Sequence, residues 1–165
     1  MGVLTAQQRN ITTSYAERCN VGPFTYDVYI GYARADHARV VKLRQKLEQR
    51  GLSCFTQYDE RYDNEAVIIA AMKKAVASSK GVVIYLSPDY LKDIWFKEES
   101  QAVLENVNFY NKNALFLLKD SRLQQNPTQF WEHRGIDVDD STFPDESLVQ
   151  RIADACPKGK YSVEK

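Results

Sequence analysis

The sequence lacks the features that define fibrous, disordered and disulfide-rich chains. Its 165 residues include only seven glycines, five prolines and three cysteines. So few glycines and prolines exclude a collagen-like or low-complexity chain. The cysteines, Cys19, Cys54 and Cys156, are odd in number and lack the spacing of a zinc site. This argues against a disulfide framework or a metal centre, and we expect a protein of the reducing cytoplasm.

Long apolar runs and an excess of charge of either sign are also missing. The longest apolar stretch, residues 81–86, is far shorter than the roughly 20 residues of a membrane-spanning helix. The first residues do not combine a basic region with an apolar one, as a secretory signal does. The 22 Lys and Arg balance 22 Asp and Glu, whereas a nucleic-acid-binding protein normally carries a basic excess. We expect no membrane insertion and no nucleic-acid partner, and favour small molecules or other proteins.

What is present is an ordinary globular composition, with 44% hydrophobic and 27% charged residues. The length suits a single domain. Residues 1–23 are polar, lack periodicity and end in Gly22-Pro23, so we expect a flexible leader there. Residues 157–165 are expected to form a similar flexible tail. The predicted domain therefore spans residues 24–156.

Strand-like and helix-like segments alternate within this domain. β-branched, aromatic and apolar runs predict five strands, at residues 26–32, 52–56, 81–86, 114–118 and 135–138. Apolar residues at helical spacing predict helices at 36–50, from Asp63 or Asn64 to 78, from Asp93 onward, and at 145–155. Such alternation predicts an α/β fold: a flavodoxin-like open parallel five-stranded sheet, order 2-1-3-4-5, with helices on both faces.

This topology predicts where a ligand would bind. Ligands bind beyond the carboxyl ends of the strands where the strand order reverses, here between the first and third strands. The loops at this point are residues 32–36 and 87–95. No glycine-rich phosphate loop follows the first strand, and Ser87 is not in a nucleophile elbow. An aspartyl-phosphate receiver is disfavoured because Leu86-Ser87, and not an aspartate, ends the third strand.

One carboxylate stands out near this point. Glu99 follows Trp95 by four residues, which places both on one helix face that Ala102 continues toward the sheet. A carboxylate on a partly apolar face needs a partner or a role. Two interpretations stay open: Glu99 pairs locally with Arg34 or Lys92, or it faces the cleft and stabilises positive charge.

Several segments together resemble the Toll/interleukin-1 receptor (TIR) domain family in order, type and spacing, over about residues 24–155. Tyr26-Asp27-Val28-Tyr29-Ile30-Gly31-Tyr32 followed by Arg34 resembles the family's first box. Ser87-Pro88-Asp89-Tyr90-Leu91 leading to Trp95-Phe96-Lys97-Glu98-Glu99 resembles the segment between its third strand and next helix, and Phe130-Trp131 its third box. Departures are Gly31 for the usual Ser, Phe96 for a frequent Cys, and a loop at 59–65 without the Pro-Gly pair of receptor and adaptor members.

The resemblance implies two functional classes. Some members are scaffolds that signal by homotypic association with other TIR domains through the loop after the second strand. Others cleave NAD+, as a substrate and not a cofactor, to nicotinamide and ADP-ribose or a cyclic product, and self-assemble to do so. Because Trp95 and Glu99 are in place and the Pro-Gly pair is missing, we favour an NAD+ nucleosidase in innate-immune or cell-death signalling, with the scaffold as the alternative.

The resemblance also assigns residues. The catalytic glutamate of the enzymes is the fourth residue after the Trp, here Glu99. Predicted substrate contacts are Tyr32, Arg34, Ser87 and Trp95, although core packing alone would explain Tyr32 and Trp95. The predicted self-association loop contains Asp59, Arg61, Tyr62, Asp63 and Asn64. A single carboxylate suits the chemistry, because nicotinamide leaves as a neutral molecule and the sugar cation left behind favours a nearby negative charge.

Overall fold

The computed structural model describes residues 25–59, 65–94, 96–109, 114–123, 135–139 and 141–156. Five parallel strands form one sheet in the order β2-β1-β3-β4-β5. The strands are β1 (Tyr26–Gly31), β2 (Cys54–Phe55), β3 (Ser79–Leu86), β4 (Ala114–Lys119) and β5 (Gly135–Asp137). The predicted flavodoxin-like fold and strand order are confirmed.

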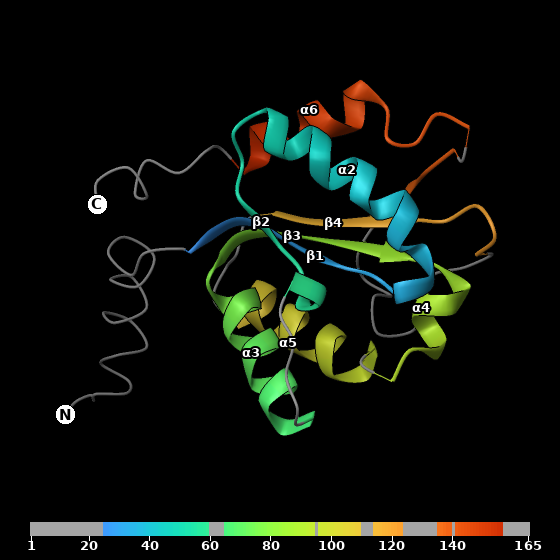
Figure 1. Ribbon diagram of the computed structural model, residues 1–165. Helices are drawn as coiled ribbons and strands as arrows, with labels where there is room; N and C mark the ends of the chain where they lie inside the picture. Colours follow the sequence, from blue (N-terminus) through green and yellow to red (C-terminus); the bar gives the residue numbers. More distant parts are fainter. Residues whose placement is uncertain are drawn as a thin grey trace.

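Helices cover both faces of this sheet (Figure 1). Helices α2 (His37–Gln49) and α6 (Glu146–Ala155) pack on one face, and α3 (Glu65–Ala77) and α5 (Phe96–Phe109) on the other. A one-turn helix, α4 (Pro88–Lys92), follows β3 at the carboxyl ends of the strands. Two short 3₁₀ helices, η2 (Arg34–Asp36) and η3 (Gln57–Asp59), follow β1 and β2. No helix in the described ranges is long and apolar enough to span a membrane.

The side chains of β1 divide between two hydrophobic clusters because successive residues of a strand point to opposite faces. Val28 and Ile30 join the cluster under α2 and α6, whereas Tyr29 joins the cluster under α3 and α5. β3 is buried along almost its whole length, as its continuous apolar run predicts. Each face of the sheet at β1 and β3 therefore has its own hydrophobic cluster, one under α2 and α6 and one under α3 and α5.

The segment after β3 differs from its sequence-based prediction. The sequence predicts a loop over residues 87–95, but Ser87 caps α4 and Pro88 begins it. Proline suits the first helical position because that position needs no N–H donor. The next helix begins at Phe96 and not at Asp93, which closes α4 in an extended conformation. Ile94, which the helix predicted from Asp93 would include on its apolar face, lies between the two helices and is 73% exposed.

Two predicted segments fall outside the described residues. These are the flexible leader, residues 1–23, and the flexible tail, residues 157–165; the Phe130-Trp131 pair also lies outside. Two other helix ends have residue types that favour them. α2 ends two residues before Gly51, and the Asp145 carboxylate caps α6 by accepting a hydrogen bond from the Leu148 backbone N–H at 2.8 Å.

Close packing at the start of β3 leaves no room for a side chain at Gly81. A Cβ atom at Gly81 would collide with the Cys156 Sγ atom and lie 2.9 Å from the Ala114 Cβ atom. We therefore expect Gly81→Ala to lower the free energy of unfolding by about 1–3 kcal/mol, measured by urea denaturation. Cys156→Ala in the same chain removes the sulfur from that space and should restore part of the loss. Additive destabilisation in the double variant would contradict this packing.

Candidate active site

The Glu99 carboxyl lies in the first turn of α5, at the carboxyl end of β1, and is fully buried. The Tyr90 hydroxyl donates to Glu99 Oε1 at 2.6 Å, and the Tyr29 hydroxyl donates to Glu99 Oε2. Among the described residues, no lysine or arginine forms an ion pair with it. The structure therefore does not show the local pairing with Arg34 or Lys92 that the sequence left open.

The space for this carboxyl is provided by Gly31. A Cβ atom at Gly31 would lie 2.7 Å from Glu99 Oε1 and 2.8 Å from the Ile84 Cδ1 atom, both too close for van der Waals contact. The sequence shows Gly31 as a departure from the usual serine of the resembled box. The structure explains that departure, because a side chain at this position would displace the buried carboxyl.

Burial sets the protonation behaviour of Glu99. Burial raises its pKa to about 7, the hydrogen bonds from Tyr29 and Tyr90 partly oppose this, and the nearby Asp93 carboxylate adds to it. Burial, reinforced by the charge of Glu99, also raises the pKa values of Tyr29 and Tyr90 well above their ordinary value. Both phenols therefore stay protonated and remain hydrogen-bond donors to the carboxylate throughout the neutral range.

Tyr32 and Arg34 lie apart from Glu99 in different ways. Tyr32 is buried in the cluster under α2 and α6, on the opposite face of β1, and its hydroxyl is 2.8 Å from His37 Nδ1. Arg34 is exposed, and its guanidinium carbon lies 4.6 Å from the centre of the Tyr58 ring. The Tyr58 hydroxyl donates to the Tyr32 backbone carbonyl at 3.1 Å. Arg34 and Tyr58 thus form an accessible cation and ring pair beside the ends of β1 and β2.

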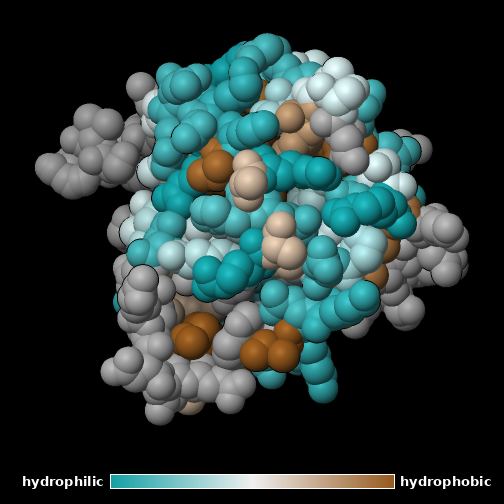
Figure 2. Space-filling model, turned by 45° about the vertical axis from the view of Figure 1, so that its right-hand side comes forward, coloured by the Kyte–Doolittle hydropathy of each residue, from teal (hydrophilic) through white to brown (hydrophobic). Residues whose placement is uncertain are grey.

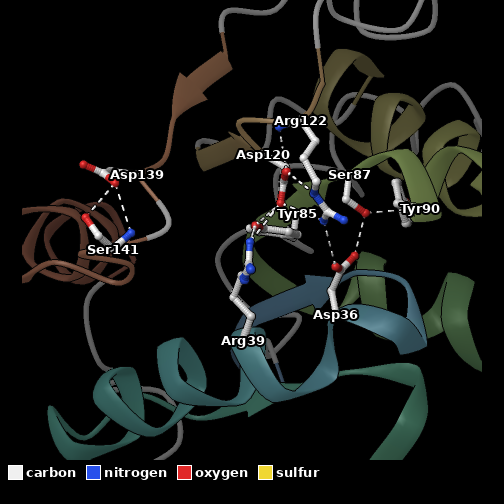
Figure 3. Close-up of polar contacts among 9 residues, drawn as sticks. All are labelled: Asp36, Arg39, Tyr85, Ser87, Tyr90, Asp120, Arg122, Asp139 and Ser141. Carbon is white, nitrogen blue, oxygen red and sulfur yellow. Dashed lines mark hydrogen bonds and ion pairs between the residues drawn. The ribbon is translucent and has the colours of Figure 1, made fainter.

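Ser87, the third predicted substrate contact, is fully buried and fully engaged. Its Oγ donates to Asp36 Oδ2 at 2.5 Å and accepts from the Tyr90 backbone N–H at 3.0 Å. Figure 3 shows Ser87 and Asp36 facing each other across the ends of β3 and η2. Ser87 therefore exposes no group to a ligand, and its hydroxyl instead connects Asp36 to the backbone of Tyr90.

A polar cluster that the sequence analysis missed surrounds this pair (Figure 3). The buried Asp120, after β4, accepts from Tyr85 at 2.5 Å, from Arg39 at 3.0 Å, and from Arg122 at 2.8 and 3.0 Å. Burial raises the pKa of Asp120, but the bonds from Arg122 and Tyr85 outweigh it and hold that pKa well below its usual range. Its members come from distant segments, so no local sequence pattern could reveal it.

The predicted self-association loop is described only at its first residue. Asp59 ends η3 and forms two hydrogen bonds to the Arg44 guanidinium of α2, at 2.5 and 2.9 Å. The remaining residues of that prediction, Arg61, Tyr62, Asp63 and Asn64, lie outside the described ranges, as does Trp95. Arg44 also donates to the Cys54 backbone carbonyl at 2.9 Å, so it ties the start of the loop to both β2 and α2.

The surface around this edge is mainly hydrophilic. Figure 2 turns the carboxyl-end side of the sheet forward and shows apolar residues only in small separate patches. Val67 and Ile94 are the large hydrophobic residues that the described part of the chain exposes. Within that same part, no group of three or more His, Cys, Asp or Glu is placed to hold a metal ion.

The geometry agrees with a known family. A family model described as "TIR domain" matches residues 28–155, most of the chain. The chain therefore belongs to the TIR domain family, as the resemblance of its motifs implied. A comparison with curated protein sequences gives no significant match.

Solved TIR domain structures share the fold. The TIR domain of the Toll-related receptor TRR-2 from Hydra magnipapillata is 25% identical, with a TM-score of 0.59 over 78% of this chain and 98% of that one. A TIR-STING receptor from C. gigas in complex with 2',3'-cGAMP is 20% identical, with a TM-score of 0.63 over 79% of this chain and 40% of the receptor. The TIR domains of the activated Roq1 resistosome are 20% identical, with a TM-score of 0.52 over 81% and 82%. Similar folds thus occur in two receptors and in a resistosome that recognises a pathogen effector.

The buried carboxyl predicts how stability depends on pH. Because the folded-state pKa of Glu99 is about 7 and the ordinary value is 4.5, the unfolded chain releases this proton first as the pH rises. The contribution of Glu99 to the free energy of unfolding is fully present below pH 4.5 and is lost as the pH rises to about 7. The loss is about 1.4 kcal/mol per pH unit, or about 3 kcal/mol in all. Glu99→Gln, which cannot ionise, should lack this loss.

Urea denaturation of both proteins between pH 4.5 and 8.5 measures the difference. Glu98→Gln is the matched control, because Glu98 is the neighbouring residue but is partly exposed, with its nearest cation Lys73 at 3.9 Å. The stability of Glu98→Gln should depend on pH in the same way as that of the wild type. Parallel pH curves for the wild type and Glu99→Gln would mean that the carboxyl does not stay neutral in the folded protein.

Proposed function

We propose that this TIR domain is a self-assembling NAD+ nucleosidase that releases nicotinamide, with Glu99 as its catalytic residue. The observation that carries the proposal is the environment of the Glu99 carboxyl. It lies at the carboxyl end of β1, beside the point where the strand order reverses, and both its oxygens are oriented by tyrosine hydroxyls. Since no cation among the described residues neutralises it, the ionised form is free to stabilise a positive charge on a ligand.

The chemistry requires only one such group. The bond between nicotinamide and the ribose C1′ atom breaks with its electron pair going to the ring nitrogen, so the cationic pyridinium leaves as neutral nicotinamide. A carboxylate beside C1′ stabilises the oxocarbenium ion that forms. Addition of water to C1′, with loss of a proton, gives ADP-ribose, and attack by the adenine ring gives a cyclic product. The Tyr29 and Tyr90 hydroxyls hold the carboxylate in one orientation.

Other residues are proposed as substrate contacts according to their placement. The exposed guanidinium of Arg34, supported by Tyr58, suits a phosphate group. Trp95 remains the proposed wall of the pocket by its resemblance alone. Tyr32 and Ser87 are both buried and hydrogen-bonded within the protein, and we propose supporting roles for them.

The burial of Glu99 also bears on self-assembly. A fully buried carboxyl cannot touch a substrate until a neighbouring segment moves. We propose that association with other TIR domains, through the loop that begins at Asp59, produces the open form. The Arg44 guanidinium binds the Asp59 carboxylate at the start of this loop and the Cys54 carbonyl of β2. A protein active only at high local concentration would follow from such a mechanism.

The second candidate is a scaffold that signals by homotypic association without catalysis. The same burial favours it, because a carboxyl with two hydroxyl donors and no exposed surface is satisfied as a structural group. In that case NAD+ is not a substrate, and association with other TIR domains is the whole function.

Nicotinamide release separates the two candidates. Concentrated protein is incubated with NAD+ and the products are resolved by liquid chromatography. We expect the wild type to release nicotinamide and Glu99→Gln to lose about 100-fold or more of that rate, because the transition-state charge loses its counterpart. Glu98→Gln should stay within about two-fold of the wild type, since its carboxyl lies about 100° around the helix.

Absence of nicotinamide release, even when the domain is fused to a multimerising partner, would favour the scaffold. Equal loss of activity in Glu98→Gln and Glu99→Gln would point to a general charge effect, and would remove Glu99 from the catalytic role.

A further inference from the structure

We propose that Ser87 and Asp36 are positioning residues, which hold the Tyr90 hydroxyl against the Glu99 carboxylate through the capped end of α4. The importance of this arrangement for catalysis rests on the proposed function. The hydrogen bonds themselves do not depend on that function, so the arrangement can be tested with or without NAD+ cleavage.

Tyr90 connects two sets of contacts through its two ends. Its backbone N–H donates to Ser87 Oγ at 3.0 Å, and its side-chain hydroxyl donates to Glu99 Oε1 at 2.6 Å. Ser87 and Tyr90 are both essentially unexposed, so water does not replace either partner. A change in the cap at Ser87 is therefore transmitted to the carboxylate through one residue.

Helix α4 depends on this cap more than a longer helix would. It has five residues, and a single helical turn is not stable alone. Tyr90 is its buried residue, and the ring packs edge-on against Phe96 with 5.2 Å between the ring centres. The position of the Tyr90 hydroxyl is thus set by the ring packing at one side and the Ser87 cap at the other.

Asp36 fixes the cap to the rest of the protein. Its Oδ2 accepts from Ser87 Oγ at 2.5 Å, and its Oδ1 lies 3.5 Å from Arg122 Nη2. Arg122 is held in turn by Asp120, which directly follows strand β4 of the sheet (Figure 3). The Ser87 hydroxyl is therefore a bridge between the sheet and α4, and it has both a donor and an acceptor role that alanine cannot fill.

Among the described residues, the titratable groups that act on the Glu99 carboxyl are Tyr29 from β1, Tyr90 from α4 and Asp93 from the connection to α5. The charge of Glu99 also raises the pKa of Tyr58 from η3, which packs on the other face of the sheet. Tyr29 is held by its own strand. Of the two hydroxyl donors, Tyr90 is the one whose backbone is bonded to Ser87, so a change at Ser87 should weaken one hydrogen bond and leave the other.

The measurement is the pH titration of the Glu99 carboxyl carbon by NMR, assigned by its absence in Glu99→Gln. A hydrogen bond to a charged group shifts a pKa by about one to two units. We expect Tyr90→Phe to raise the titration midpoint by about one unit and Ser87→Ala to raise it by a similar or smaller amount. Asp36→Asn should shift it in the same direction by less, because the amide oxygen still accepts a bond from Ser87.

If the domain cleaves NAD+, the same variants should change activity in a defined way. A rise of one unit in the midpoint lowers the ionised fraction at pH 7 about five-fold, so nicotinamide release should fall about five-fold at pH 7 and recover by pH 9. Ser87→Thr keeps the hydroxyl and should restore both readouts. Ser87→Ala added to Tyr90→Phe should produce no further shift, because the hydroxyl that Ser87 positions is already gone.

Asp145→Ala is the matched control, since it also removes a cap, from α6 on the other face of the sheet. It should lower stability without moving the Glu99 midpoint. Should Ser87→Ala not fold, the near-isosteric Ser87→Cys, whose thiol is a weak donor and acceptor, takes its place. A midpoint unchanged by substitution at Ser87 but raised by Tyr90→Phe would overturn the proposal. Absence of nicotinamide release with a shifted midpoint would reject the proposed function alone.

Discussion

The site depends on the burial of one carboxyl group between two tyrosine hydroxyls. A carboxylate that leaves water loses several kcal/mol of solvation unless the protein replaces the lost hydrogen bonds. Here Tyr29 and Tyr90 replace them, one at each oxygen of Glu99, and Gly31 leaves the space that the group occupies. Residues from β1, α4 and α5 must therefore meet at one point, and the sheet order that places β1 beside β3 makes this meeting possible.

The faces of β1 decide which side chains take part. Tyr29 and Gly31 are two residues apart and serve the face under α3 and α5, whereas Tyr32 serves the other face. The sequence placed Tyr32 among the substrate contacts because it ends the strand, without following the alternation of side chains. Because Tyr29 and Gly31 are two residues apart, the same alternation predicts that both lie on the face of β1 that contacts Glu99. This part of the site could therefore have been predicted from the sequence.

Contacts between residues far apart in the sequence could not be predicted, for a physical reason. The strands and their order follow from local patterns, because β-branched runs and helical spacing repeat within short windows. The bond between Asp36 and Ser87 joins residues 51 positions apart, and Arg39 meets Asp120 across 81 positions. Such pairs obey no local period. Asp120 and Arg122 also fall between the strands predicted at 114–118 and 135–138, where the sequence predicts no helix or strand. Their cluster is therefore visible only in the three-dimensional structure.

In the proposed reaction, the raised pKa of Glu99 links substrate binding to ionisation. With a pKa of about 7, the carboxyl is about half protonated at neutral pH in the closed protein. The nicotinamide ring of NAD+ carries a positive charge, and an opposite charge within about 4–6 Å lowers the pKa of a carboxyl group. Binding would thus release a proton and create the anion at the moment when the sugar cation needs it. A neutral carboxyl before binding is easier to bury. The Tyr29 and Tyr90 hydroxyls, whose hydrogen bonds lower the pKa of Glu99, then hold the anion in position once it has formed.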